Sequence, residues 1–427
     1  MSAVTVQTRS RRSGRMEPRP RSAGWPAKGW RAGLGRLALL LLLAVGAKGR
    51  AADLDIAFIG SLSGANANIA QDQLDGFRLA VRHLGGRLGG IEFALSVIDD
   101  EGRADMARQA AEQFWQSAPP HVLLLSSSGA SLDLLAPLAA SHRSLIINLG
   151  AASATVAGRD CTANLFSMVV RGDSLQEQAG IFLQRQGYRR VAVFDGSVSK
   201  AALAALRRGF SGEIVEFTAR PGNMDFKDDL ASLRKSKVDA AYLLHRGGMA
   251  VEFLLQYAAS NLKDQVPLVG SADVLDQTVL AASAPSALDL YSVGPWTDDL
   301  DSPANHRLTA DFEGDYGRPV SENAAGGYDA VMALDAAIRA VKGKLGDFDA
   351  LRAALKRAEF PSTRGSFRFD NDQFPAVNFW IRQVAADQRG RLINEQRGLL
   401  QKDVHDSVAH ECTMRMTDSP PAVAKTR

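Results

Sequence analysis

Short apolar runs alternate with longer amphipathic segments along most of the chain after residue 52. Such runs are too short for helices and indicate strands buried on both faces, as in a parallel sheet. In the first half of the chain the predicted strands are residues 55–60, 91–98, 122–125 and 145–147. Between them, residues 71–84 and 104–115 and the series Leu132, Leu135, Leu138 have apolar positions at helical spacing. This alternation predicts an α/β fold with a doubly wound parallel sheet.

A second set of alternating elements follows Cys161. Its predicted helices are residues 176–185, 200–210, 226–235 and 250–259, and its predicted strands are residues 190–194, 213–217, 239–244 and 267–270. The last third has predicted helices at 304–316, 330–341 and 348–358, then predicted strands at 365–370 and 377–384. Two sets of similar size in 427 residues predict two lobes, each with its own core.

The first 52 residues have the composition of an export signal. They contain eleven Lys and Arg residues against the single acid Glu17, and an apolar run at 37–45. That run is too short to span a bilayer, and Ala47 or Ala51 offers a cleavage site with small residues. We therefore expect cleavage and a periplasmic location, with a polar tail after Met416 that does not fold.

The net charge of the whole chain is +3, but the part that remains after removal of the predicted leader is acidic. The leader carries +10, which leaves −7 for the remaining residues. Phosphate binding requires a basic face, so this balance argues against a nucleic-acid partner.

Small and hydroxyl-bearing residues follow two neighbouring predicted strands. Residues 126–129 read SSSG after the first, and residues 148–153 read NLGAAS after the second. Because ligands of open α/β sheets bind beyond the carboxyl ends of the strands, we expect both turns at one ligand cleft. Free N–H groups at a helix start favour an anion, and small residues allow close approach to the backbone. The alternative is that the serines only cap helices.

Two further candidates end strands of the second set. Arg246 could pair with an anionic ligand, or it could be a solvated surface arginine. Asp195 could accept a hydrogen bond in the cleft, or it could cap a helix.

The sequence shows no motif of a common enzyme class. G-x-S-x-G, P-loop, H-E-x-x-H and C-x-x-C patterns are missing, and the paired acids Asp99-Asp100 and Asp228-Asp229 are interpreted as solvated or capping. The spacing of His405, His410 and Cys412 fits no standard zinc site. We expect no catalysis, no cofactor and no metal.

Several segments carry a family resemblance, and they span residues 53 to 412. They are IAFIGSLSGANANIAQDQLDGFRLAV from Ile56, FALSVIDDEG from Phe93, the SSSG and LGAAS turns, DFKDDLASLRKSKVDAAYLL from Asp225, GGYDAVMALDAAI from Gly326 and RGSFRFDNDQFPAVNFWIRQV from Arg364. In their order and spacing they resemble the periplasmic solute-binding proteins of ABC importers, type I fold, of the leucine/branched-chain amino-acid-binding group.

The resemblance implies two lobes that close over a ligand, joined by three hinge crossings. On this basis residues 53–170 with 298–360 form the first lobe and residues 171–297 with 361–400 form the second. The leader occupies residues 1–52 and a C-terminal tail residues 401–427.

The resemblance also implies binding residues. Family members hold an amino acid's carboxylate at the first turn, which corresponds to Ser127, Ser128 and Gly129. The second turn, which holds carboxylate and ammonium, corresponds to Ala151, Ala152 and Ser153. Asp273 is the nearest candidate for the acid that binds the ammonium in the family. Ile69 and Val198 stand where aromatic residues are often found, which weakens the prediction of an α-amino-acid ligand.

Cys161 and Cys412 are the only cysteines. An even count in an exported protein indicates a disulfide. Proteins that the chain resembles often have a similar pair, so we predict a bond that ties the tail to the lobe junction.

The resemblance implies a monomeric substrate-binding protein that delivers a small solute to an ABC transporter permease in the inner membrane. The ligand stays open among amino acids, amides and organic acids. The alternative is a sensory module that presents its closed form to a membrane receptor or kinase.

Overall fold

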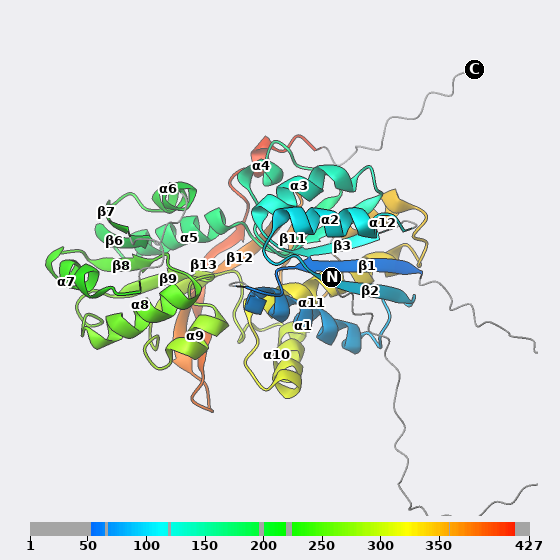
Figure 1. The fold of residues 1–427 in the computed structure, drawn as a ribbon. Helices are drawn as coiled ribbons and strands as arrows, with labels where there is room; N and C mark the ends of the chain where they lie inside the picture. Colours follow the sequence, from blue (N-terminus) through cyan, green and yellow to red (C-terminus); the bar gives the residue numbers. More distant parts are fainter. Residues whose placement is uncertain are drawn as a thin grey trace, which may run out of the picture.

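Two lobes lie side by side and are joined by several chain crossings in the computed structural model (Figure 1). The structure describes residues 53–64, 67–117, 121–195, 200–218, 224–357 and 359–414. The predicted export signal, Val198 and the predicted tail after Met416 lie outside these residues.

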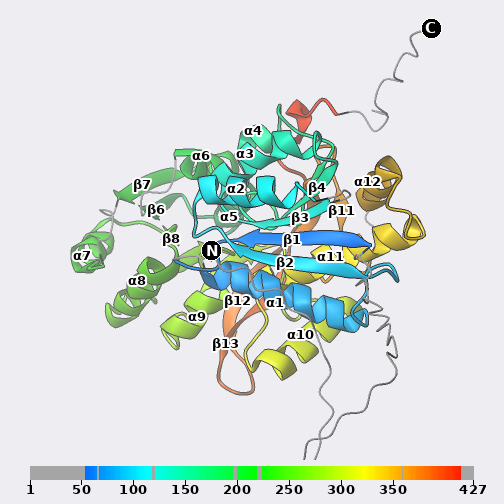
Figure 2. The ribbon, with the colours of Figure 1, turned by 45° about the vertical axis from the view of Figure 1, so that its right-hand side comes forward.

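The first lobe is built on a five-stranded parallel sheet with the order β2-β1-β3-β4-β5. Its strands are β1 (Leu54–Gly60), β2 (Phe93–Asp99), β3 (His121–Ser126), β4 (Ser144–Asn148) and β5 (Leu165–Ser167). On one face lie α1 (Ala67–His83), α10 (Pro303–Tyr316), α11 (Glu322–Ala340) and α12 (Phe348–Arg357). On the other face lie α2 (Ala104–Phe114), α3 (Gly129–Ala139) and α4 (Ala154–Ala157), as Figure 2 shows for α2 and α3.

Alternate residues of each central strand enter the two cores of this lobe. Ile56 and Phe58 of β1 pack toward α1 and α11, whereas Ala57 and Ile59 pack toward α2 and α3. All four side chains are buried, which is why the strand reads as an unbroken apolar run.

The second lobe has a mixed sheet with the order β11-β12-β10-β9-β8-β6-β7, in which β13 also pairs with β12. The parallel strands are β6 (Arg190–Asp195), β7 (Glu213–Thr218), β8 (Ala240–Leu243), β9 (Leu268–Ser271) and β10 (Tyr291–Gly294). The antiparallel part consists of β11 (Arg368–Phe369), β12 (Pro375–Ala386) and β13 (Leu392–Val404). Its helices are α5 (Gly172–Arg185), α6 (Lys200–Gly209), α7 (Lys227–Lys235), α8 (Gly247–Ala259) and α9 (Gln277–Ser283).

The two-lobed α/β fold predicted from the sequence is confirmed, but the second sheet is not wholly parallel. The long hairpin of β12 and β13 adds antiparallel pairing that a strand–helix alternation does not predict. β13 was missed as a strand, and it continues to Val404, past residue 400, where we predicted the tail to begin. The other predicted lobe boundaries stay predictions.

Helix α11 begins at Glu322, earlier than the predicted start at residue 330. Its glycines pack against α1: a Cβ on Gly327 would lie 2.0 Å from the carbonyl oxygen of Gln73, and one on Gly76 would lie 2.0 Å from that of Ala324. The glycines therefore allow the two helix backbones to touch. This contact fixes the start of α11, which faces the second lobe.

The chain crosses between the lobes where β5 leads to α5, where β10 leads to α10 and at the start of β12, because Phe369 of β11 and Phe374 belong to cores of the first lobe whereas Val377 of β12 belongs to a core of the second. A further segment runs from β13 back to the first lobe, because Val404 belongs to a core of the second lobe while Val408 packs on a core of the first. Among the described helices, none is long and apolar enough to cross a membrane.

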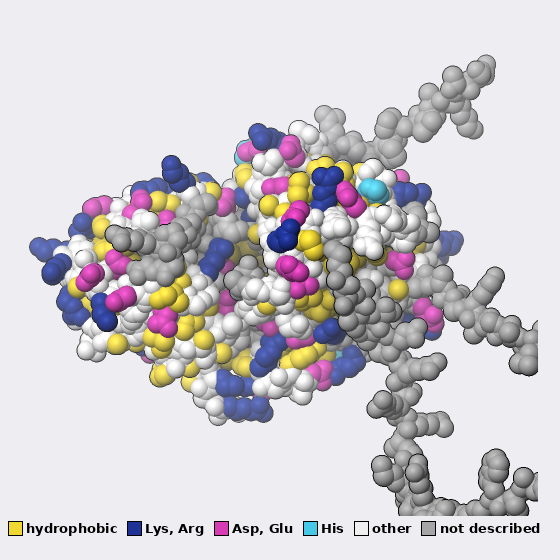
Figure 3. All heavy atoms as spheres, in the orientation of Figure 1, with side chains coloured by type: hydrophobic (Ala, Val, Ile, Leu, Met, Phe, Trp, Pro, Cys, Tyr) yellow, Lys and Arg dark blue, Asp and Glu magenta, His cyan; other side chains and the backbone are white. Residues whose placement is uncertain are grey.

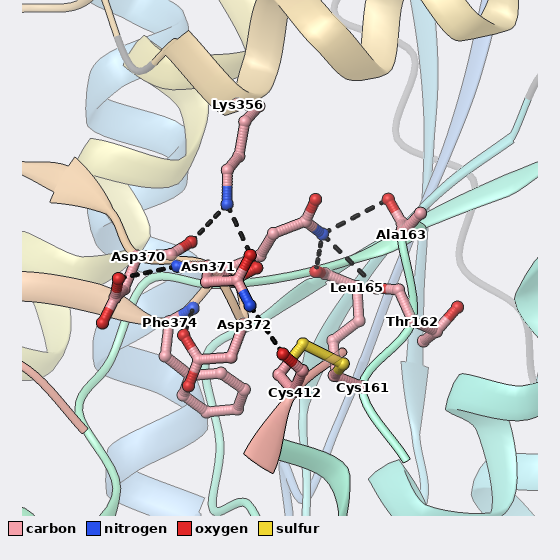
Figure 4. Close-up of a disulfide and its surroundings, with 11 residues drawn as sticks. Cys161, Thr162, Ala163, Leu165, Lys356, Asp370, Asn371, Asp372, Phe374 and Cys412 are labelled. Atoms are coloured by element: carbon pink, nitrogen blue, oxygen red, sulfur yellow. Dashed lines mark hydrogen bonds between the residues drawn. A yellow bond between two sulfur atoms is a disulfide. The ribbon is translucent and has the colours of Figure 1, made fainter. Parts of the chain in front are cut away.

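The predicted disulfide between Cys161 and Cys412 is present, with the two Cα atoms 5.7 Å apart. It attaches the returning C-terminal segment to the first lobe (Figure 4). Asn371 supports the same junction, because its Nδ2 donates to the carbonyl oxygen of Cys412 at 2.7 Å. Cys412 is thus committed to the disulfide, and no cluster of possible metal ligands occurs in the described part of the chain.

Candidate ligand-binding cleft

A cavity of about 210 Å³ lies between the lobes, in the groove visible in Figure 3. Both lobes and the crossings contribute to its walls. From the first lobe come Ile69, Leu149, Gly150, Ala151, Val320, Ser321, Glu322 and Asn323; from the crossings Val169, Val170, Trp296 and Asp298; and from the second lobe Gly172, Leu175, Arg246, Ala272, Asp273, Leu275, Asp276, Gln277, Arg382 and Asn394.

The serines of the two turns have local structural partners. Ser128 caps α3, with its Oγ 3.2 Å from the N–H nitrogen of Ser131. Ser153 caps α4 in the same way and donates to Asp133 at 2.7 Å. The buried Ser127 donates to Asp100. The three hydroxyls thus hold the turns in shape, and their contact with a ligand stays a prediction.

The structure brings the two turns together at the carboxyl edge of β3 and β4. A Cβ on Gly150 would lie 2.2 Å from the carbonyl oxygen of Ser127, so only glycine permits this approach. Gly129 lies next to Ala151 and Ala152. Of these residues, Gly150 and Ala151 line the cavity. The N–H of Ala151 donates to no acceptor in the described chain, so it is available to a ligand.

The two charged residues expected from the second lobe, Arg246 and Asp273, both line the cavity and form an ion pair with each other. Ser271 also donates to Asp273. The Asp273 carboxylate is therefore already paired with an arginine, so it is not a free partner for the ammonium group of a ligand. Asp195 ends β6 and does not line the cavity.

Arg382 is a cleft residue that the sequence analysis did not identify. It lies on β12 opposite Ser292 of β10, and it is 2% exposed. Its Nε donates to Ser292 Oγ at 3.0 Å, and its Nη1 donates to the Trp296 carbonyl at 3.2 Å and to Glu322 at 3.3 Å. Gly294 provides the space, because a Cβ there would lie 2.9 Å from Nη1. The signal in the sequence was a single charged residue directly after the apolar residues Phe379, Trp380 and Ile381 of a predicted strand.

Three more acids line the cavity. Burial raises the pKa of Asp298 to about 7 and that of Asp276 to about 6. Asp276 also caps α9, accepting from the N–H groups of Thr278 and Val279. Burial raises the pKa of Glu322, although the Arg382 charge opposes that shift. Near neutral pH this wall is therefore less negative than its residue types indicate.

Trp296 provides an aromatic wall. Its indole Nε1 donates to Asn305 Oδ1 at 2.8 Å, which fixes the ring. Leu149, Leu175 and Val320 line the same cavity. Apolar walls with a few polar groups are typical of small-molecule sites, so the cavity suits a ligand with an apolar body. Trp296 and Asp298 follow β10, a strand that was not predicted from the sequence. They could therefore not be recognised as residues that follow the end of a strand.

The family model described as periplasmic binding protein matches residues 53–389. Comparison with curated protein sequences gave no match.

Three similar solved structures illustrate the range of ligands. The solute-binding protein of an ABC transporter from R. palustris, in complex with benzoate, is 26% identical with a TM-score of 0.74, and the match covers 84% of this chain and 99% of that one. One from Rhodopseudomonas palustris BisB5, with 3,4-dihydroxybenzoic acid, is 22% identical with a TM-score of 0.74, and the match covers 83% and 98%. A leucine-binding protein from Thermotoga maritima is 16% identical with a TM-score of 0.68, and the match covers 80% and 97%.

Proposed function

Because the chain belongs to the periplasmic binding protein family, we propose that it is the substrate-binding protein of an ABC importer, which delivers a small solute from the interlobe cleft to an inner-membrane permease. As a family member it is a binding protein and not an enzyme. Family membership implies a periplasmic location, and export by residues 1–52 is part of the proposal. The observation that carries it is the cavity lined by both lobes.

The proposed ligand is a small carboxylate with an apolar, preferably aromatic, body. Trp296 and the aliphatic walls suit such a body. A volume of about 210 Å³ is smaller than the roughly 300–1,000 Å³ of drug-sized sites, which favours a ligand of one ring. The benzoate complex from R. palustris supports this class over an aliphatic amino acid.

The carboxylate is assigned to the first-lobe end of the cavity. The Ala151 N–H is available there, and Gly150 lets a ligand reach the backbone. Arg246 supplies positive charge from the second lobe, although Asp273 shares it. Ser127, Ser128, Gly129, Ala152 and Ser153 are proposed to shape this end. A ligand that touches both lobes stabilises the closed form by its differential affinity for that form.

A thermal-shift panel tests this function. Mature protein from residue 53, unfolded and refolded to remove bound solute, is heated with benzoate, hydroxybenzoates, aliphatic carboxylates, amides and leucine. A ligand at 100 times its Kd stabilises by about 2.7 kcal/mol, so aromatic carboxylates should raise Tm clearly.

The matched variants are Ala151→Leu, which places a larger side chain in the cavity, and Ala154→Leu, which is exposed and does not line it. Only Ala151→Leu should abolish the ligand-induced shift. If no solute of the panel shifts wild-type Tm, the proposed function is contradicted.

A further inference from the structure

We propose that Arg382 and Asp298 form a second polar subsite of the cleft, which takes a neutral ligand group that both accepts and donates a hydrogen bond, such as a hydroxyl or a carboxamide. This inference rests on the proposed function and extends it by assigning a second recognition point on the ligand. Both residues line the cavity.

The guanidinium of Arg382 has donors to spare. An arginine carries five N–H groups in a planar fork. Nε and Nη1 donate to Ser292, Trp296 and Glu322, but Nη2 has no acceptor among the described residues. A buried charged donor without an acceptor is unfavourable, so an acceptor atom on the ligand gains the full interaction.

The position of this guanidinium is fixed before any ligand arrives. Arg382 on β12 is held by Ser292 of the neighbouring strand β10, and Gly294 leaves room for it, because a Cβ there would lie 2.9 Å from Nη1. Ser292 in turn donates to Asn394 of β13 at 3.4 Å. A donor held on sheet strands loses little freedom when it binds, which favours specificity.

Asp298 supplies the matching acceptor. Its Oδ1 is buried and accepts no hydrogen bond in the part of the chain that the structure describes. Asp298 and Arg382 influence each other electrostatically, yet no ion pair or hydrogen bond joins them. A ligand group that reaches both atoms would accept from Nη2 and donate to Oδ1.

The charges around the cavity select a neutral group for this position. Acids outnumber arginines along the walls, the acids being Asp273, Asp276, Asp298 and Glu322 and the arginines Arg246 and Arg382. Glu322 already pairs with Arg382, so a ligand carboxylate would compete with an existing partner of the guanidinium, and a ligand ammonium would meet the like charge of Arg382. A hydroxyl or carboxamide avoids both penalties and satisfies both unpaired atoms.

Calorimetric titration of the mature protein with benzoate and with 2-, 3- and 4-hydroxybenzoate tests the subsite. At least one hydroxybenzoate should bind the wild type about 10-fold or more tightly than benzoate, the gain expected for a hydrogen bond to a charged group. Asp298→Ala should remove this preference, because it should weaken the binding of the hydroxybenzoate more than that of benzoate.

Two further variants guard against a purely structural effect. Arg382→Lys keeps the positive charge beside Glu322 but loses Nη2, and it should also reduce the preference. Asp299→Ala removes the neighbouring acid, which is exposed and does not line the cavity, and the preference should persist. Melting curves confirm that each variant is folded.

The inference is overturned if the wild type binds benzoate as tightly as every hydroxybenzoate, or if the panel gives hits only among solutes without a hydroxyl or carboxamide. It is also overturned if Asp298→Ala weakens benzoate and hydroxybenzoate equally. These outcomes leave the proposed function intact, whereas a wild type that binds no solute of the panel contradicts both.

Discussion

At the scale of single residues, several buried polar groups have incomplete hydrogen bonding. Arg382 and Asp298 meet at the cleft, where a ligand can complete their bonds. His245 differs, because it lies two residues after β8, packs against the rings of Phe226 and Phe253 and does not line the cavity. Neither ring nitrogen of His245 has a partner among the described residues. A buried group of this kind affects stability rather than binding.

His245→Phe should reduce the sensitivity of the fold to acid. Burial lowers the pKa of His245 to about 4, from about 6.5 in an unfolded chain. Because the folded pKa is the lower one, the neutral ring contributes stability that is complete above about pH 6.5 and is lost as the pH falls toward 4. At about 1.4 kcal/mol per pH unit, the loss reaches about 3 kcal/mol.

Urea unfolding at pH 7.5 and pH 5, compared between wild type and variant, measures this effect. Asp298 and Asp276, with raised pKa values, change stability in the opposite direction over this range, but they act equally in both proteins. The exposed His306→Gln serves as control. An unchanged pH dependence in His245→Phe would show that the ring is not a buried neutral group.

At the scale of elements, helix α11 connects the core of the first lobe to the cleft. Ser321 caps it, accepting from the N–H of Ala324 at 3.1 Å, and its first turn carries Glu322 and Asn323 to the cavity wall. The contact of Gly327 with the backbone of α1 sets the position of this turn relative to α1. Packing between two helices thus positions residues of the candidate site.

Gly327→Ala should destabilise the protein by about 3 kcal/mol or more, since the new Cβ meets backbone that cannot turn aside. Gly314→Ala is the matched control within another helix of the same lobe. Gly314 is exposed, has no atom within 4 Å of an added Cβ, and should gain up to about 1 kcal/mol of helix propensity. Chemical denaturation compares the two. Equal effects would mean that α1 and α11 do not touch as described.

At the scale of the whole molecule, the C-terminal segment closes the chain onto the first lobe. After β13 this segment returns toward the first lobe. There Arg171 and Asp406 form a buried ion pair, in which Nε and Oδ2 lie 2.7 Å apart. The disulfide between Cys161 and Cys412, 251 residues apart in sequence, then fixes its end. The disulfide therefore anchors the chain that returns from the second lobe to the first lobe.

Replacing both cysteines, as Cys161→Ala with Cys412→Ala, should lower the free energy of unfolding by about 2–5 kcal/mol, because a long loop is released in the unfolded chain. Ligand affinity should stay the same, since neither residue lines the cavity. Equilibrium denaturation and the thermal-shift panel measure the two quantities. A stability equal to that of wild type, or a lost ligand response, would contradict this description.

The sequence by itself determined the features that depend on local pattern. Burial on two faces makes β1, β3 and β4 apolar throughout, so these strands and the turns after them could be placed without the structure. The parallel alternation then predicted that the turns at Ser127 and Ala151 meet, and the cysteine count predicted the disulfide.

Only the tertiary structure decided which distant side chains share the cleft. Asp273 pairs with Arg246, and Arg382 enters the cavity beside Glu322, because β12 returns antiparallel to β10 and α11 packs on α1. Such contacts join residues from separate elements, and their energies depend on burial and neighbours that no sequence window contains. The local pattern therefore determined most buried strands and the turns after them, whereas β10, β13 and the contacts between elements depended on tertiary packing.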